Sequence, residues 1–203
     1  MDKFKNKYRI PSARLQTWDY GSNGSYFITI CTKNRQHFFG AISNDEMQLN
    51  EMGKLAEQYW VEIPNHFPFI VLGNFVVMPN HIHGILIINK PDANNANVVP
   101  VETPKLGVST TTVNVATNET TATNRTIKSK TGGKNEKWKP ETIGVIINQY
   151  KRVVTINTRK IHADFEWQPR FHDHIIRNAE SFERIQNYIA NNPQNWKDDK
   201  FYS

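Results

Sequence analysis

The 203-residue sequence lacks the features that mark several large classes of protein. It contains one cysteine, Cys31, which excludes both a disulfide within the chain and a metal site built from several cysteines. No apolar run approaches the roughly 20 residues that a membrane-spanning helix needs. The N-terminus, MDKFKNKYRIPSARLQ, is basic but has no apolar centre of the kind that signal peptides carry. These absences favour a location in a bacterial cytoplasm.

A glycine-rich phosphate-binding loop is also missing, because no stretch matches G-x-x-x-x-G-K, and no nucleotide cofactor is expected. Positive charge, by contrast, is in excess, with a formal net charge of +6. Lysine and arginine crowd the N-terminus and the segment Lys151–Lys160. A basic balance favours a polyanionic partner, because phosphates that bind to a protein release condensed counterions. The charge alone does not identify that partner as a nucleic acid.

A polar segment interrupts the chain. Residues 94–137 are rich in Thr, Asn, Lys and Gly, contain no aromatic residue and show no sustained periodicity. Such a segment cannot bury enough apolar surface to offset the entropy that is lost on ordering. We therefore predict a single domain formed by residues 1–93 and 138–203, with a flexible Thr/Asn-rich insertion at residues 94–137.

The periodicity of apolar residues predicts both strands and helices in the rest of the chain. Strands are expected at Ser25–Thr32, Met47–Leu49, Phe75–Met78 and Ile82–Ile88, and helices after Asn50, from Pro140 and after Asn178. The pair Asn44-Asp45 predicts a turn, and Pro193 should end the last helix. Strands with helices between them indicate the α+β class, with an antiparallel sheet flanked by helices.

The segment Phe75–Ile88, FVVMPNHIHGILII, contains two histidines in a strand pattern. Alternate side chains of a strand share a face, so His81 and His83 should point the same way, about 7 Å apart along the strand. Two imidazoles at this spacing can bind one divalent cation, although a bare H-x-H also occurs on polar sheet faces without a metal. A second H-x-H, His172-Asp173-His174, has no strand pattern around it, which favours surface or packing histidines, or a contact with DNA.

The last predicted helix offers further polar groups. Tyr188 and Asn192 are four residues apart and should share a helix face. Tyr188 lies at the edge of the apolar stripe, so its hydroxyl could leave the core; the alternative is a boundary tyrosine with a hydrogen-bonded hydroxyl. Asn192 precedes Pro193, and residues before proline avoid the α region, so its side chain should depart from the ideal direction. Tyr150 is a rival reactive tyrosine, but it falls within a predicted core stripe.

Three stretches together resemble one known family. They are YFITICTKNRQHFFG, FVVMPNHIHGILII and WQPRFHDHIIRNAESFERIQNYIANNPQNW. They are similar to the REP-associated tyrosine transposases, relatives of the insertion-sequence single-tyrosine transposases in the HUH nuclease superfamily. The resemblance covers Arg14–Asp92 and Lys139–Trp196, and its specificity comes from the order of V-M-P-N-H-x-H, W-Q, H-I-I-R-N and Y-I-x-x-N-P. It implies the ferredoxin-like, or RRM-like, fold of HUH nucleases.

The resemblance also implies roles for the matching residues. His81 and His83 match the two metal-binding histidines of the family, and Tyr188 matches its nucleophile. Asn192 stands where the insertion-sequence relatives carry a glutamine that completes the metal site. Asparagine offers the same amide oxygen on a stem that is one methylene shorter. The implied cofactor is Mg²⁺ or Mn²⁺ bound next to a substrate phosphate.

The implied activity is that of a metal-dependent single-stranded DNA transposase or endonuclease. Such an enzyme cleaves and rejoins DNA at hairpin (REP-like) sequences through a 5′-phosphotyrosine intermediate. A monomer is favoured over a homodimer. Two alternatives stay open, namely a hairpin-binding protein of the same fold that does not cut, and a metal hydrolase that uses water as nucleophile. The basic residues expected to contact the DNA are Arg14, Lys151, Arg152, Arg159 and Arg177.

Overall fold

A computed structural model describes residues 3–4, 7–8, 14–15, 17–91 and 140–202 of the chain. The expected insertion at residues 94–137 lies outside the described residues, so the division into one domain and an insertion stays a prediction. Near the N-terminus, two short strands, β1 (Lys3–Phe4) and β2 (Lys7–Tyr8), pair in antiparallel fashion. No helix in the described part of the chain is long and apolar enough to cross a membrane.

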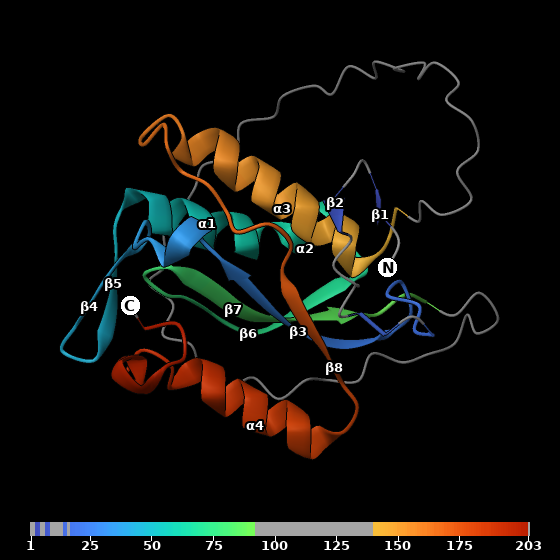
Figure 1. The fold of residues 1–203 in the computed structure, drawn as a ribbon. Helices are drawn as coiled ribbons and strands as arrows, with labels where there is room; N and C mark the ends of the chain where they lie inside the picture. The colour runs from blue at the N-terminus through green and yellow to red at the C-terminus, as the bar shows by residue number, and fades with distance from the viewer. Residues whose placement is uncertain (1–2, 5–6, 9–13, 16, 92–139, 203) are drawn as a thin grey trace, which may run out of the picture. The chain divides into compact units, whose positions relative to one another are not determined.

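A four-stranded antiparallel sheet organises the described residues (Figure 1). Its strands lie in the order β6-β7-β3-β8, so β7 and β3 are central and β6 and β8 form the edges. Aromatic and β-branched residues dominate the central strands, as is usual for strands that pack on both faces. The bounds are β3 (Gly24–Cys31), β6 (Ile70–Val77), β7 (His81–Ile88) and β8 (His172–Ile176).

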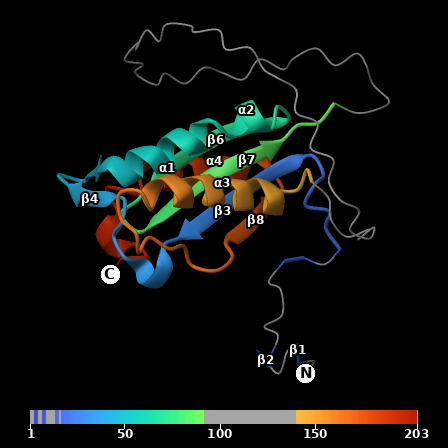
Figure 2. The same ribbon diagram turned by 90° about the horizontal axis from the view of Figure 1, so that it is seen from above.

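Helices cover both faces of this sheet (Figures 1 and 2). One face carries α1 (Glu51–Val61), which leads into the short α2 (Ile63–His66), and α3 (Ile143–Thr158); the other carries α4 (Ala179–Ala190). The side chains of Asn50 and Asn178 cap α1 and α4 by accepting hydrogen bonds from backbone N–H groups, as their residue types predicted. The predicted α+β class, an antiparallel sheet flanked by helices, is confirmed.

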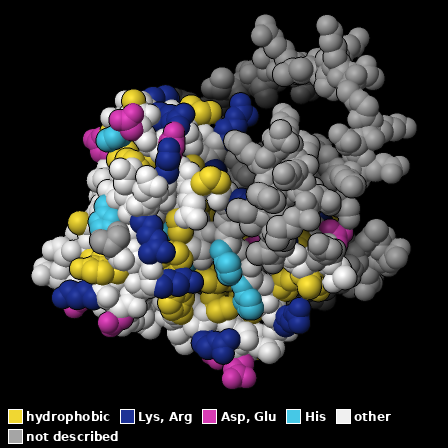
Figure 3. Space-filling view, viewed as in Figure 1, with side chains coloured by type: hydrophobic (Ala, Val, Ile, Leu, Met, Phe, Trp, Pro, Cys, Tyr) yellow, Lys and Arg dark blue, Asp and Glu magenta, His cyan; other side chains and the backbone are white. Residues whose placement is uncertain are grey.

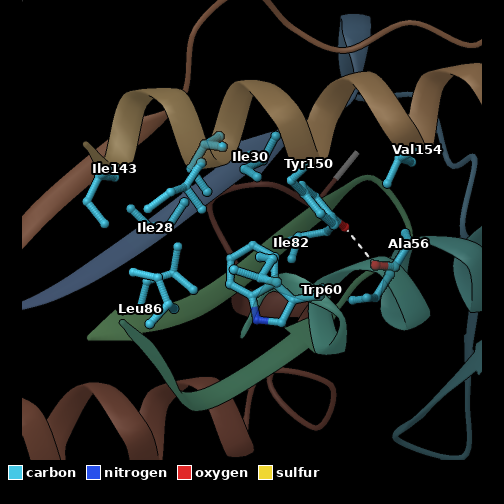
Figure 4. Close-up of a cluster of buried hydrophobic side chains, with 14 of the residues drawn as sticks. Ile28, Ile30, Ala56, Trp60, Ile82, Leu86, Ile143, Tyr150 and Val154 are labelled. Carbon is cyan, nitrogen blue, oxygen red and sulfur yellow. Dashed lines mark hydrogen bonds between the residues drawn. The ribbon is translucent and has the colours of Figure 1, made fainter. Parts of the chain in front are cut away.

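The larger hydrophobic core lies between the sheet and the two long helices α1 and α3 (Figure 4). Ile82 of β7 and Trp60 of α1 are both fully buried there. Tyr150 of α3 is only 2% exposed, and its hydroxyl donates a hydrogen bond of 2.8 Å to the carbonyl of Ala56. Tyr150 therefore occupies the core position that its apolar stripe predicted, away from solvent.

Gly84 of β7 packs directly against the ring of Trp60. A Cβ atom at Gly84 would lie 2.9 Å from Trp60 Cε2 and nearer still to Cζ2. Because a buried indole has little room to move, we expect Gly84→Ala to lower the free energy of unfolding by about 1–3 kcal/mol. Thermal denaturation measures this loss. Gly144→Ala is the control, since its nearest neighbour is the flexible end of Arg14; equal losses in both variants would contradict the packing argument.

A short hairpin precedes α1. Strands β4 (Gly40–Ser43) and β5 (Glu46–Leu49) pair across the turn expected at Asn44-Asp45. Asn44 and Asp45 have φ angles of 52° and 60°, as in the type I′ turns that favour Asn and Asp. A 3₁₀ turn at Lys33–Arg35 connects β3 to this hairpin.

Some elements differ from those expected. β6 begins five residues before the predicted Phe75, and α3 begins at Ile143 instead of Pro140. The prediction that His172-Asp173-His174 lies outside a strand is wrong, because these residues form the start of β8. Its exposed side chains are polar and it is an edge strand, so the apolar alternation that marks a strand is weak. Backbone pairing with β3, which the local sequence does not reveal, establishes β8.

Candidate active site

Two histidines of β7 lie at the centre of the candidate site. His81 pairs with Cys31 and His83 pairs with Thr29 across the β3–β7 ladder, so both side chains point to the face that α4 covers. The centroids of the two rings are 4.4 Å apart. The side chains are 0% and 1% exposed. The structure thus brings together the predicted pair in a buried position.

Hydrogen bonds orient both rings. His81 Nδ1 lies 2.8 Å from Asn80 Oδ1. Asn80 Nδ2 donates to two backbone carbonyls, which directs the amide oxygen at His81 and places the ring proton on Nδ1. His83 Nδ1 forms a hydrogen bond of 2.9 Å with Thr29 Oγ1. This leaves the Nε2 atoms of the two rings for other partners, as in metal sites where Nδ1 holds the imidazole in position.

Tyr188 of α4 reaches the same centre. Its hydroxyl lies 3.2 Å from His83 Nε2 and donates to Asp199 Oδ2 at 3.0 Å. Tyr188 is 41% exposed, whereas the two histidines are buried. Tyr188 is therefore partly open to solvent, whereas Tyr150 is enclosed in the core.

Asn192 also joins the site, although α4 ends before it. The helix stops at Ala190, and Asn192 lies just beyond it with 1% exposure. Its Nδ2 donates to Asp199 Oδ2 at 2.7 Å. The expectation that Asn192 leaves the ideal helical direction ahead of Pro193 agrees with this position past the last turn.

Asp199 is the residue that the sequence interpretation missed. A 3₁₀ turn at Trp196–Asp198 reverses the chain and directs Asp199 at the histidines. His81, His83 and Asp199 offer three ligand atoms that all lie within 4.8 Å of one another. The local sequence, KDDKF, contains two adjacent aspartates and no pattern that distinguishes them. Asp199 is recognised only in the folded structure, where the C-terminal segment packs next to the two histidines.

Two buried polar atoms in this centre have no hydrogen-bond partner among the described residues. They are His81 Nε2 and Asn192 Oδ1. Leaving such an atom unsatisfied costs roughly 1–3 kcal/mol, so a folded protein rarely keeps two in one place without a function. A divalent cation would satisfy both. Imidazole nitrogens with amide and carboxylate oxygens form a donor set that fits Mn²⁺, or Mg²⁺ with water and phosphate oxygens.

Burial controls the protonation of the histidines. Removal from water lowers the pKa of His81 from 6.5 to about 3, and nearby cationic side chains add to the shift. Burial also lowers the pKa of His83 well below 6.5, with a further contribution from His81. Both imidazoles are therefore neutral at pH 7, which is the form that binds metal ions.

We expect the metal-free protein to lose stability as the pH falls below the ordinary histidine range. The pKa of His81 is about 3 in the folded protein and near its ordinary 6.5 in the unfolded chain, so the unfolded state takes up protons first. The contribution of neutral His81 to the free energy of unfolding is complete above about pH 6.5 and decreases toward about pH 3. Urea denaturation between about pH 7 and pH 5, where most carboxylates are already ionised, measures the slope of the free energy of unfolding against pH. His81→Asn should reduce it, and the exposed His66→Asn should not; equal slopes in all three proteins would contradict the prediction.

The basic residues expected to contact DNA lie in two places. Arg14 and Arg177 are near β8, and Arg14 Nε is 2.9 Å from Asp173 Oδ1. The other three belong to α3 and its C-terminal cap, on the sheet face opposite the histidines: Lys151, Arg152 and Arg159. The ammonium of Lys151 donates to the carbonyls of Gln168 and Arg170. The structure does not bring this α3 group together with the candidate site.

Comparisons with known proteins give the following similarities. No protein-family model matches the chain. A Haemophilus influenzae protein, called only "Uncharacterized protein", is 35% identical over 196 residues, which cover 94% of this chain and 92% of that protein. A solved structure of a REP-associated tyrosine transposase bound to a REP hairpin is 16% identical, with a TM-score of 0.49, and the match covers 95% of this chain and 73% of that one. A protein from Deinococcus radiodurans, described as a candidate transposase, is 12% identical with a TM-score of 0.41 over 89% of this chain and 97% of that one.

Proposed function

The chain belongs to the same family as the Haemophilus influenzae protein, and we propose that it is a metal-dependent enzyme that cleaves and rejoins single-stranded DNA. One observation carries the proposal. The hydroxyl of the partly exposed Tyr188 lies 3.2 Å from His83 Nε2, beside a centre where two buried polar atoms have no hydrogen-bond partner among the described residues. The stretches that resemble the REP-associated tyrosine transposases contain both histidines, Tyr188 and Asn192. Motif and geometry therefore support the same class of enzyme.

Four side chains are proposed to hold the metal ion: His81, His83, Asn192 and Asp199. Two neutral imidazoles and a neutral amide alone would attract a divalent cation weakly, and Asp199 adds the one negative charge. Asn192 Nδ2 donates to Asp199, which directs Oδ1 of the same amide away from that carboxylate. When bound, Mg²⁺ or Mn²⁺ supplies positive charge that polarises a backbone phosphate and stabilises the charge that develops on it.

Tyr188 is the proposed nucleophile. Its oxygen attacks the phosphorus atom, the bond from phosphorus to the 3′ oxygen breaks, and the protein keeps a 5′-phosphotyrosine while a 3′-hydroxyl leaves. Burial and the charge of Asp199 raise the pKa of Tyr188, so the phenol is protonated before the reaction. Asp199 Oδ2 accepts a hydrogen bond from this hydroxyl, so the phenol proton passes to Asp199 as the bond to phosphorus forms, and the leaving 3′ oxygen takes a proton from water. Because the intermediate is still a phosphodiester, a 3′-hydroxyl can attack it and rejoin the strands.

The proposed substrate is a DNA hairpin with an adjacent single strand, as the resemblance to REP-associated transposases implies. The excess positive charge of the chain favours such a polyanion. Both halves of the site, the histidines of β7 and Tyr188 of α4, come from one chain and are in hydrogen-bond contact. This arrangement supports a monomer as the active form, since no second copy is needed to complete the site.

An adduct assay tests the proposed function. The protein is incubated with end-labelled hairpin DNA from its own genomic neighbourhood and Mn²⁺ or Mg²⁺, and covalent complexes are separated on a denaturing gel. We expect a protein–DNA adduct that forms with the cation and does not form in EDTA. DNA binding without any adduct would instead support a hairpin-binding protein, and cleavage without an adduct would indicate water as nucleophile.

A further inference from the structure

A hollow with a volume of 510 Å³ is lined by residues of β8, of the first turns of α4 and of the segment that precedes β3. Figure 3 shows histidine side chains over β8 with lysine and arginine side chains close by. Apolar and polar groups share the wall of the hollow, which is in the size range of pockets that hold a small-molecule-sized group. Its lining includes Leu15, Tyr20, His174, Arg177, Ser181 and Arg184.

Positive charge is in excess in this hollow. Within the described residues, no carboxylate forms an ion pair with Arg177 or Arg184, and Arg184 donates a long hydrogen bond of 3.5 Å to Ser181 Oγ. The one carboxylate of the lining, Asp173, is already paired with Arg14. The N-terminal end of α4 adds a partial positive charge. Guanidinium groups in such a setting bind phosphate well, because their N–H groups match two phosphate oxygens.

The α4 residues that line the hollow lie on the same face of the helix as the proposed nucleophile. Ser181, Arg184 and Tyr188 follow one another at spacings of three and four residues, so they share one face of the helix. Arg184 precedes Tyr188 by about one turn, or roughly 6 Å along the axis. A group bound at Arg184 is therefore close to a phosphate bound at Tyr188.

On the other side of the hollow, β8 pairs with β3, which contacts the histidine centre. His174 pairs with Phe27 of β3, and His172 pairs with Thr29, so these side chains share the α4 face of the sheet. Thr29 Oγ1 bonds directly to His83 Nδ1. Both histidines are exposed; His174 lines the hollow, and His172 lies two residues nearer to the histidine centre along β8.

We propose that the hollow binds one nucleotide of the single strand next to the scissile phosphate. The backbone phosphate of this nucleotide binds Arg177 and Arg184, and its base packs against the apolar wall that Leu15 and Tyr20 provide. The backbone N–H of Leu15 donates to the Tyr20 hydroxyl at 3.0 Å, which holds these two residues together. The proposal rests on the proposed function, because the bound strand is the one that Tyr188 attacks.

Charge-neutral variants of the two arginines test this site. Arg177→Gln and Arg184→Gln change exposed side chains and should fold normally, which melting temperatures verify. Lys54→Gln is the charge-matched control, because this exposed lysine of α1 lies on the sheet face opposite α4 and is not among the residues expected to contact DNA. In EDTA, fluorescence anisotropy should show that each hollow variant binds the flanked hairpin about tenfold more weakly. The slope of log K against log[salt] should become shallower by about 0.7 for each lost phosphate contact, and the control should behave as wild type.

A phosphate scan then places the contact. Neutral methylphosphonates are introduced one at a time along the single strand on both sides of the cleavage position. We expect one position whose neutralisation weakens wild-type binding at least tenfold yet leaves the double variant Arg177→Gln/Arg184→Gln unaffected, because that variant has already lost both contacts to the phosphate. Equal effects in the two proteins at every position would overturn the proposal.

The two proposals fail in distinguishable ways. If wild-type protein forms the covalent adduct but both arginine variants keep wild-type affinity and salt dependence, only the nucleotide site in the hollow is wrong. If wild-type protein forms no adduct and binds no hairpin, the proposed function fails and the nucleotide site fails with it.

Discussion

Tyr188→Phe is expected to abolish covalent attachment of DNA, with a loss of adduct formation on the order of 10⁴-fold. The substitution removes the one oxygen that would attack phosphorus and keeps the ring. That ring packs edge-on against Phe27, with centroids 6.1 Å apart, so the fold should be preserved. The hydroxyl also lies within hydrogen-bond distance of His83 Nε2, the atom proposed to bind the cation, so the two compete for this nitrogen. Metal affinity should therefore be unchanged or higher in Tyr188→Phe, which separates the nucleophile from the metal site.

Two other tyrosines provide controls for this experiment. Tyr202 is 51% exposed and packs on Trp196 in the C-terminal segment that carries Asp199. Tyr150 is buried, and Tyr150→Phe removes only its hydrogen bond to the carbonyl of Ala56. Both Tyr202→Phe and Tyr150→Phe should keep the adduct at temperatures where they are folded. An adduct that survives in Tyr188→Phe and disappears in either control would show that the nucleophile is assigned to the wrong tyrosine.

His81→Ala is expected to eliminate metal binding, with a loss of Mn²⁺ affinity of about 100-fold or more, and with it the adduct. His81 Nε2 is fully buried, carries no proton in the orientation set by Asn80, and has no hydrogen-bond partner in the part of the chain that the structure describes. In wild type, Mn²⁺ at 100 times its Kd should stabilise the folded state by about 2.7 kcal/mol. Thermal denaturation with and without Mn²⁺ measures this shift, which should be absent in His81→Ala.

The oxygen ligands can be ranked by the same measurement. Asp199→Asn removes the negative charge but keeps the shape, and it should weaken Mn²⁺ binding about 10- to 100-fold. Asn192→Ala should show a smaller loss, since the amide is neutral. His66→Ala changes an exposed histidine of α2 and should bind Mn²⁺ as wild type does. A wild-type metal shift in His81→Ala would show that the cation, if one binds, uses a different site.

Much of the fold could be predicted because its signals are local. The strand-forming run of β3 and the apolar run of β7 have a period or composition that neighbouring residues alone define. Asn50 and Asn178 cap helices through hydrogen bonds to residues three positions away. The turn at Asn44-Asp45 likewise depends on the left-handed conformations that these two residue types tolerate. β8 was missed because an edge strand with exposed histidines lacks such a local signal.

The sequence by itself determined that His81 and His83 share one face of a strand, since the alternation of side chains is a property of the strand alone. It also distinguished Tyr188, at the edge of an apolar stripe, from Tyr150 within one. Only the tertiary structure decided that Tyr188 meets His83, 105 positions away in the chain. The same is true of Asp199, of the orientation of Asn192 and of the arginine-lined hollow. These features depend on how α4, β8 and the C-terminal turn pack on the sheet, and packing between segments distant in sequence leaves no periodic pattern in either segment.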